Sequence, residues 1–305
     1  MGTRMAGRFA PTPSSDLHVG NLRTALVAWL AARSSGRRFL VRVEDLDAPR
    51  LNHAEEIAER QMEDLARLGL DHDGAVVRQQ DRTALYVEAL ERVGDQVYEC
   101  FCSRKDVAEA TRAPHGTTPR YPGTCRDLSE SERARLRKVR PPCLRINASS
   151  AHVSFIDLLH GACAGEVDDF VVRRADGVFA YNFAVVVDDG LQGVDQVVRG
   201  DDLLDSSPRQ AWLAAKLGFP VPVYLHVPLV HSLDGTRLAK RDQAVTLTRL
   251  REAGVSAQQV LARLASSLGL ADPAERVTLA DLVERFDPAA LPRDPWLVDP
   301  LSWAG

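Results

Sequence analysis

The chain has 305 residues, 45% of them hydrophobic and 26% charged, with a formal net charge of −4. This composition is typical of a packed soluble protein and excludes a disordered or collagen-like chain, while the length exceeds the roughly 100–200 residues of a usual domain. The first residues lack the apolar core of a secretory signal, and no run of about 18 uncharged apolar residues occurs, so we expect a cytoplasmic protein with no membrane partner.

The first fifty residues have the pattern of a strand, a loop, a helix and a second strand. Residues 7–10 form a short apolar stretch that Pro11 and Pro13 stop. A helical pattern runs from about Asn21 to Gly36, which suits a helix C-cap, and residues 37–45 are rich in β-formers. This order is typical of a βαβ unit and predicts a parallel sheet.

Further elements follow along the chain. Residues 54–68 and 84–98 have the spacing of amphipathic helices, and three apolar stretches predict strands, at 153–159, 169–174 and 181–189.

The last third of the chain has one more strand pattern among helices. Ser207 and Pro208 predict a helix start, with Ser207 at the N-cap and Pro208 at the first helical position. Residues 224–230 read as a strand, and the tail from Thr246 reads as mostly helical.

Residues 100–143 differ in kind and predict an inserted module. They hold four of the five cysteines, several prolines and a basic run at 133–140. An odd number of cysteines argues against a disulfide framework and favours metal binding or core packing. Three thiolates, from Cys100, Cys102 and Cys125, can supply most of a tetrahedral zinc site, and the fourth ligand must lie nearby. Cys143 and Cys163 have no matching partner pattern and are expected to be core or structural residues.

The loop PTPSSDLHVGN, at residues 11–21, leads directly into a helix and has the chemistry of a phosphate site. Free backbone N–H groups and the positive end of the helix dipole favour an anion, and His18 can donate to it. Gly20 permits close backbone approach. Taken alone, the motif is more often an ordinary turn.

A second candidate lies at residues 235–242, GTRLAKRD. Lys240 and Arg241 follow a turn at Asp234 and Gly235, and a loop lysine that reaches a triphosphate would stabilise the charge that develops during nucleotidyl transfer. On spacing alone, a solvated basic turn is the commoner interpretation.

The two motifs and three stretches between them, RVEDLD, YNFAVVVDD and VVRGDDLLDSSPRQ, resemble the class I glutamyl-tRNA synthetases in order and content over about residues 7–245. The resemblance implies a Rossmann-like catalytic fold that activates glutamate with ATP and Mg²⁺. It places the HIGH element of that family at His18, Val19, Gly20 and Asn21, and the KMSKS element at Arg237, Leu238, Ala239, Lys240 and Arg241.

Two departures from the family pattern stand out. Ser15 stands where glycine is usual, and Ala239 and Arg241 replace serines. Lys240, the residue expected at the phosphates, is retained, so we expect activity with altered rates.

The same resemblance implies the glutamate pocket. Arg8 and Arg199 match positions that hold substrate carboxylates, Glu44 matches the position that meets the α-ammonium, and Tyr181 lines the site; Phe9, Ala10, Pro11 and Thr12 complete it. The chemistry is consistent, because a bidentate arginine–carboxylate contact rejects glutamine, whereas aspartate must be excluded by reach. Without the family context each residue also has a plainer interpretation, as a surface ion pair, a strand-end charge or a core aromatic.

The cysteine module narrows the resemblance to the short glutamyl-queuosine tRNA(Asp) synthetases. That group implies structural zinc held by Cys100, Cys102, Tyr121 and Cys125, with His115 as the competing fourth ligand. Only residues 242–305 follow Arg241, which is room for a small helical domain but not for an anticodon-binding domain as well. The group transfers activated glutamate to queuosine at the wobble position, so the implied partners are L-glutamate, ATP and tRNA(Asp) carrying queuosine.

We therefore expect a protein with an α/β class I synthetase fold that acts as a monomer. The expected parts are a Rossmann-like first half at 1–98, an inserted zinc module at 99–175, a second half at 176–235, and the KMSKS-like loop with a helical domain at 236–305. The rival interpretations are a glutamyl-tRNA synthetase without an anticodon domain and a non-catalytic paralogue. The basic run at 133–140 is a candidate RNA contact or, equally, a solvated helix face.

Overall fold

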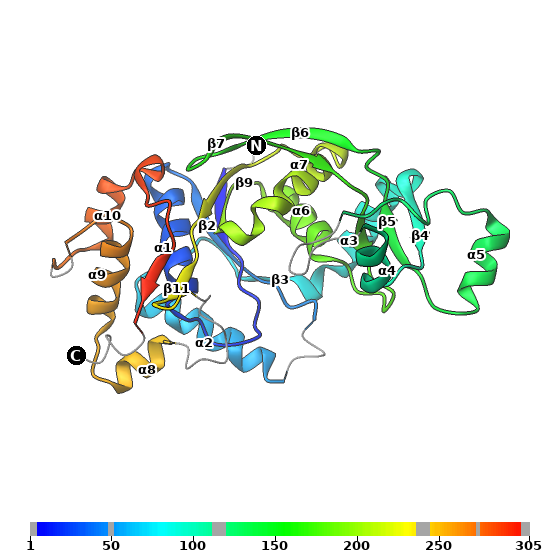
Figure 1. Ribbon diagram of the computed structural model, residues 1–305. Helices are drawn as coiled ribbons and strands as arrows, with labels where there is room; N and C mark the ends of the chain where they lie inside the picture. Colours follow the sequence, from blue (N-terminus) through cyan, green and yellow to red (C-terminus); the bar gives the residue numbers. More distant parts are fainter. Residues whose placement is uncertain (1–4, 48–51, 112–119, 236–244, 273–274, 300–305) are drawn as a thin grey trace.

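A seven-stranded sheet forms the centre of the molecule in the computed structural model, which describes residues 5–47, 52–111, 120–235, 245–272 and 275–299 (Figure 1). All neighbouring strands run parallel except the last pair, which is an antiparallel hairpin. In spatial order the strands are β3 (Val77–Arg78), β2 (Arg38–Val43), β1 (Ala6–Phe9), β9 (Val194–Gly200), β10 (Val223–Val227), β6 (Ala151–Asp157) and β7 (Gly161–Val167). The predicted α/β class and parallel βαβ start are confirmed.

Helices cover both faces of this sheet. Alternate strand residues face opposite sides, so Phe39 and Val41 pack with α1 (Val19–Ser34), whereas Leu40 and Tyr224 pack toward α7 (Ser207–Lys216). The remaining helices beside the sheet are α2 (Ala54–Arg67), α3 (Thr83–Arg92) and α6 (Tyr181–Gln192).

The strand order places a ligand site at one point of the sheet edge. The chain crosses from β1 to β2 on one side and returns on the other side at β9, so β1 and β9 are neighbours at a reversal of strand order. In open α/β sheets, ligands bind at the carboxyl ends of the strands at such a point. The end of β1 carries Arg8 and Phe9, and the end of β9 carries Arg199.

A small antiparallel sheet lies beside the main one, at the right of Figure 1. It consists of β4 (Val97–Cys100), β5 (Cys143–Ile146) and β8 (Phe170–Arg173), with α4 (Arg104–Thr111) and α5 (Glu130–Arg137) nearby. Its own apolar cluster contains Tyr98, Cys100, Phe101, Tyr121 and Cys125.

The C-terminal part is helical, as predicted, and packs on α1. It contains α8 (Leu247–Glu252), α9 (Ala257–Ser267) and α10 (Leu279–Arg285), whose first turns are capped by Thr246, Ser256 and Thr278. Two short strands that the sequence did not predict, β11 (Val230–Ser232) and β12 (Trp296–Val298), pair with each other. Short 3₁₀ turns occur at Gln79–Arg82, Gly94–Gln96, Asp201–Ser206 and Pro288–Ala290. Across the described ranges, no helix combines the length and apolar character that a membrane crossing requires.

Three predicted elements differ from the structure. The predicted strand at 181–189 is wrong, because this stretch lies in α6. Phe183 to Asp189 are all buried, so the apolar run has no helical period, and the signal that was overlooked is Gly193, which ends the helix with φ +70°. The helix predicted at 84–98 ends at Arg92 and is followed by β4. Ser206, not Ser207, is the N-cap of α7.

Candidate active site

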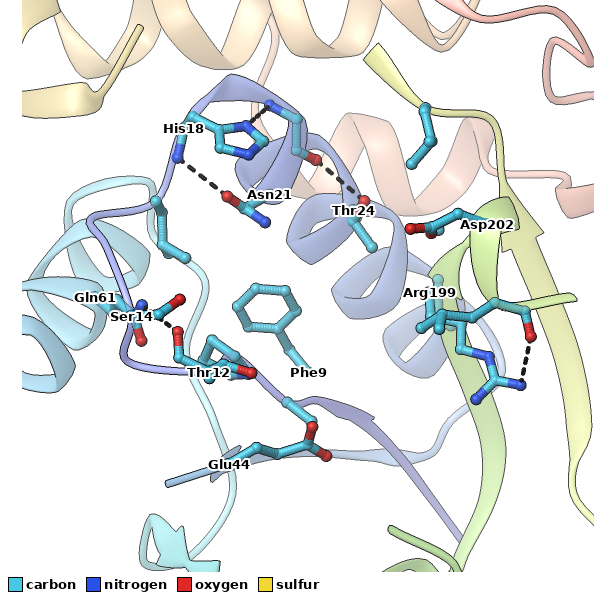
Figure 2. A pocket seen from close by; sticks show the side chains of 18 of the residues that line it. Phe9, Thr12, Ser14, His18, Asn21, Thr24, Glu44, Gln61, Arg199 and Asp202 are labelled. Atoms are coloured by element: carbon cyan, nitrogen blue, oxygen red, sulfur yellow. Dashed lines mark hydrogen bonds between the residues drawn. The ribbon is translucent and has the colours of Figure 1, made fainter. Parts of the chain in front are cut away.

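One pocket collects the predicted glutamate and nucleotide residues that the structure describes (Figure 2). It has a volume of about 420 Å³ and lies at the carboxyl ends of β1, β2, β9 and β10. The predicted residues that line it are Arg8, Phe9, Ala10, Pro11, Thr12, His18, Gly20, Asn21, Glu44, Tyr181 and Arg199. Segments separated by more than 150 residues therefore meet in one cavity.

His18 is the N-cap of α1, and its ring is fixed in orientation. Its Nδ1 accepts a hydrogen bond from the Gly20 N–H at 3.1 Å, so in the neutral ring Nε2 carries the proton and can donate. Asn21 Oδ1 accepts from the His18 backbone N–H at 3.2 Å (Figure 2). A Cβ on residue 20 would lie 2.9 Å from His18 Cε1, so only glycine leaves room for this ring position.

The expectation of free backbone N–H groups at this turn is wrong. The Val19 N–H donates to Val245 O at 3.0 Å, and the Gly20 N–H is used by His18. The groups at this turn whose chemistry suits an anion are therefore the His18 ring, the Asn21 amide and the dipole of α1.

The same bond joins the His18 turn to Val245, the first described residue after the second motif. His18 forms a β-bridge with Thr246, and Val230, at the start of β11, lines the pocket. Val245 and Thr246, after the second motif, thus lie at the His18 turn, and Val230, before it, lies at the pocket. Arg237, Leu238, Ala239, Lys240 and Arg241 themselves lie outside the described residues.

Arg199 is a buried cation whose five N–H groups all meet neutral acceptors. Nε donates to His226 Nε2 at 3.1 Å, and Nη1 donates to Gln210 Oε1 at 2.6 Å and Tyr181 Oη at 3.5 Å. Nη2 donates to Ser207 Oγ at 2.8 Å and Leu203 O at 3.3 Å. Among the described residues, no carboxylate lies within ion-pair distance of it. A buried cation is costly without a counter-charge, so this position favours the binding of an anion.

Arg8 and Glu44 belong to a charged cluster in the floor of the pocket. Asp189 Oδ1 lies 3.3 Å from Arg8 Nε and 2.7 Å from Arg42 Nη1, and Glu44 lies 3.2 Å from Arg42 Nη2. Burial opposes ionisation of Asp189, but the two arginines outweigh it and hold its pKa below the ordinary value. Burial dominates at Glu44 and raises its pKa, although Arg42 and Arg8 act in the opposite direction.

Replacing Glu44 with glutamine is expected to leave the melting temperature unchanged or raise it at pH 7. The raised pKa means that the folded chain holds ionised Glu44 at a cost, which is present above that pKa and relieved as the pH falls toward the ordinary 4.5. Thermal unfolding at pH 7 and pH 5 measures this. A variant that melts below wild type at pH 7 would contradict it.

The loop between β1 and α1 is held by residues that sequence reasoning missed. Gln61, on α2, donates to Thr12 O at 3.1 Å and Ser15 O at 2.8 Å, and the Glu44 N–H donates to Pro11 O at 2.9 Å. Gln61 is buried and lines the pocket. Its only sequence signal was an amide on the apolar side of an amphipathic helix. The departure from the family pattern at Ser15 thus lies in a loop that Gln61 holds through backbone atoms.

Three predicted metal ligands lie together in the small sheet region. The Sγ atoms of Cys100, Cys102 and Cys125 all lie within 4.8 Å of one another. Tyr121 Oη is 3.3 Å from Cys100 Sγ and 3.8 Å from Cys102 Sγ, and it accepts the Cys125 N–H at 2.8 Å. A tetrahedral ion with bonds of about 2.3 Å to sulfur spaces its ligands about 3.8 Å apart, so these side chains can hold a metal ion.

The other cysteines and the basic run lie outside this cluster. Cys143 Sγ donates to Cys100 O at 3.4 Å, and Cys163 is a half-buried residue of β7. His115 lies outside the described residues. In the basic run, Arg137 pairs with Glu99 and Glu130, and Arg140 lies 3.3 Å from Asp106, so part of its charge is already neutralised.

Comparison with known proteins agrees with this geometry. Residues 4–299 match the family described as tRNA synthetases class I (E and Q), catalytic domain. A protein from Nocardia farcinica named glutamyl-Q tRNA(Asp) synthetase is 57% identical over 96% of this chain and 93% of its own length. A relative of the same name from Cutibacterium acnes is 51% identical over 94% and 85%. The crystal structure of a glutamate tRNA ligase from Elizabethkingia meningosepticum in complex with its amino acid has a TM-score of 0.81 at 24% identity, covering 99% of this chain and 68% of that one, which shows the shared fold.

Proposed function

The chain belongs to the class I tRNA synthetases for glutamate and glutamine, and within them to the glutamyl-Q tRNA(Asp) synthetases, and on this premise we propose that it is a ligase that activates L-glutamate with ATP and transfers it to queuosine in tRNA(Asp). The observation that carries the proposal is Arg199, a buried guanidinium at the pocket wall whose hydrogen-bond partners are all neutral.

Glutamate would occupy the end of the pocket between Arg8, Glu44 and Arg199. The two longest contacts of Arg199, to Tyr181 and Leu203, are the ones that a substrate carboxylate would replace most readily. Glu44 would receive the α-ammonium, and Arg8, whose Nη2 has no hydrogen bond within the described part of the chain, would meet a carboxylate. Glutamine would bring a donor amide to a donor guanidinium, so the site rejects it.

ATP would occupy the end of the pocket at the start of α1. The α-carboxylate of glutamate attacks the α-phosphorus, the bond to the bridging oxygen breaks, and glutamyl-adenylate and pyrophosphate form. His18 Nε2–H and the Asn21 amide face this end and would donate to phosphate oxygens, with Lys240 as the proposed cation at the triphosphate. Mg²⁺ would accompany ATP and offset the charge of its phosphates.

In the second step, a hydroxyl of queuosine attacks the acyl carbon of the adenylate and AMP leaves. A wobble base lies in a single-stranded loop, where bases can be splayed out and read by a protein pocket. We propose zinc as a structural ion at Cys100, Cys102, Tyr121 and Cys125, and we expect the chain to act as a monomer.

Glutamate-dependent exchange between ATP and pyrophosphate, followed by acylation assays, tests this function. We expect exchange with glutamate but not glutamine, and glutamate transfer to tRNA(Asp) that carries queuosine but not to tRNA(Asp) that lacks it. Charging of tRNA(Glu) at its 3′ end would favour a glutamyl-tRNA synthetase. Absence of exchange both without tRNA and with queuosine-containing tRNA(Asp) would favour a non-catalytic paralogue.

A further inference from the structure

On the side away from the pocket, Arg199 is hydrogen-bonded to a series of buried polar side chains that do not line the pocket. His226 is on β10 directly opposite Arg199 on β9, and its Nε2 lies 3.1 Å from Arg199 Nε. Asp157, at the end of the next strand β6, places Oδ2 2.6 Å from His226 Nδ1. Both His226 and Asp157 are almost wholly inaccessible to solvent. The three side chains therefore form a line across adjacent strands.

The hydrogen bonds fix which nitrogen of His226 carries the proton. Asp157 Oδ1 accepts hydrogen bonds from the backbone N–H groups of Leu159 and His160, each at 2.9 Å. Its Oδ2 accepts one from the backbone N–H of His226 at 3.0 Å. A carboxylate with these partners is an acceptor only, so His226 Nδ1 must be the donor and Nε2 must be the acceptor. Burial also lowers the pKa of His226, in keeping with a neutral ring.

Resting on the proposed function, we infer that His226, oriented by Asp157, is a positioning residue that sets the plane of the Arg199 guanidinium for the carboxylate of glutamate. The five N–H groups of a guanidinium point in fixed directions within one plane, so the acceptor at Nε, together with those at the two Nη groups, defines the plane of the fork. Ser207 Oγ, 3.2 Å from His226 Nε2 and 2.8 Å from Arg199 Nη2, closes the network on the same side.

His226 cannot act on the substrate directly. It does not line the pocket, and its two ring nitrogens are both used, one by Asp157 and one by Arg199. Its loss would leave the Arg199 Nε–H buried without an acceptor, while Gln210 and Ser207 still hold the two Nη groups. The guanidinium would remain in place but would be free to tilt, which weakens a bidentate contact without removing the charge.

Steady-state exchange kinetics of the full chain test the inference with His226→Leu, which lacks the acceptor, and His226→Gln, which can restore one. We expect His226→Leu to raise the glutamate KM about tenfold or more, as for loss of one hydrogen bond to a charged group, and to leave the ATP KM within about twofold. His226→Gln should recover most of the loss. Tyr224→Phe is a buried change on the same strand that keeps the ring beside Arg199, and it should leave the KM for glutamate and for ATP at the wild-type values.

Where His226→Leu alone does not fold, Asp157→Asn/His226→Leu removes the buried charge together with its partner and gives the same readout. An unchanged glutamate KM overturns the inference. So does an equal loss for glutamate and ATP that follows the melting temperature and that His226→Gln does not rescue. A wild-type chain that neither binds glutamate in calorimetry nor catalyses exchange overturns the proposed function instead.

Discussion

Replacing Arg199 with lysine is expected to lower kcat/KM for glutamate in the exchange reaction by about a hundredfold or more, with the ATP KM close to that of wild type. The charge is kept, but the planar fork is lost. An ammonium has three N–H groups and cannot donate to all the acceptors that the five N–H groups of Arg199 now meet. His226, Gln210 and Ser207 would each be left with an unmatched buried group. The loss should therefore exceed that of His226→Leu.

Exchange kinetics at varied glutamate and fixed saturating ATP, and the reverse, measure this effect. Arg37→Lys is the matched control, because Arg37 forms a fork with Asp195 near the start of β2, at the sheet edge opposite the pocket. It should lower stability slightly and leave both KM values alone. Equal effects of the two variants, or an Arg199→Lys enzyme with the wild-type glutamate KM, would contradict the assignment of Arg199 to the substrate carboxylate.

The second large effect concerns the metal. The purified chain should contain one equivalent of zinc, and Cys100→Ser/Cys125→Ser should lose it together with the ordered packing of the small sheet. Structural zinc sites have apparent binding energies of about 10–16 kcal/mol, more than a cluster of six buried side chains can replace. Metal analysis and thermal unfolding with and without a chelator measure this.

Cys163→Ser is the control for that experiment, because Cys163 lies on β7, outside the three-thiol cluster. This variant should retain the zinc. Tyr121→Phe and His115→Ala separate the two candidates for the fourth ligand: the first should weaken zinc binding and the second should not. A metal-free wild-type chain of full stability would refute the site.

The fold was predictable where local signals and family motifs agreed. The strand, turn and helix around His18 followed from the prolines after the strand and the glycine after the helix, the tail was predicted as mostly helical, and the structure has both. The stretch 181–189 was misread as a strand, because a helix buried on all sides has no apolar period to distinguish it. Only the glycine at its end marked it as a helix.

The pocket was predictable as a set of residues but not as a network. Motif order was enough to bring Arg8, Glu44 and Arg199 to one cavity. The residues that hold them, Asp189 beneath Arg8 and His226 behind Arg199, are joined to them by pairings across strands and helices far apart in sequence. No spacing rule shows such contacts. The backbone donors at the His18 turn were misjudged for the same reason, since Val245 takes one of them.

The packing of α1 bears on how small this enzyme can become. α1 is covered by the sheet on one side and by residues of α9 and α10 on the other, and its buried Arg23 donates to Ser267 and to Pro228 O. The helix that begins with His18 therefore shares one core with the last quarter of the chain. An excised nucleotide-binding half would expose that apolar surface, so the minimal folding unit of the catalyst extends into the C-terminal helices.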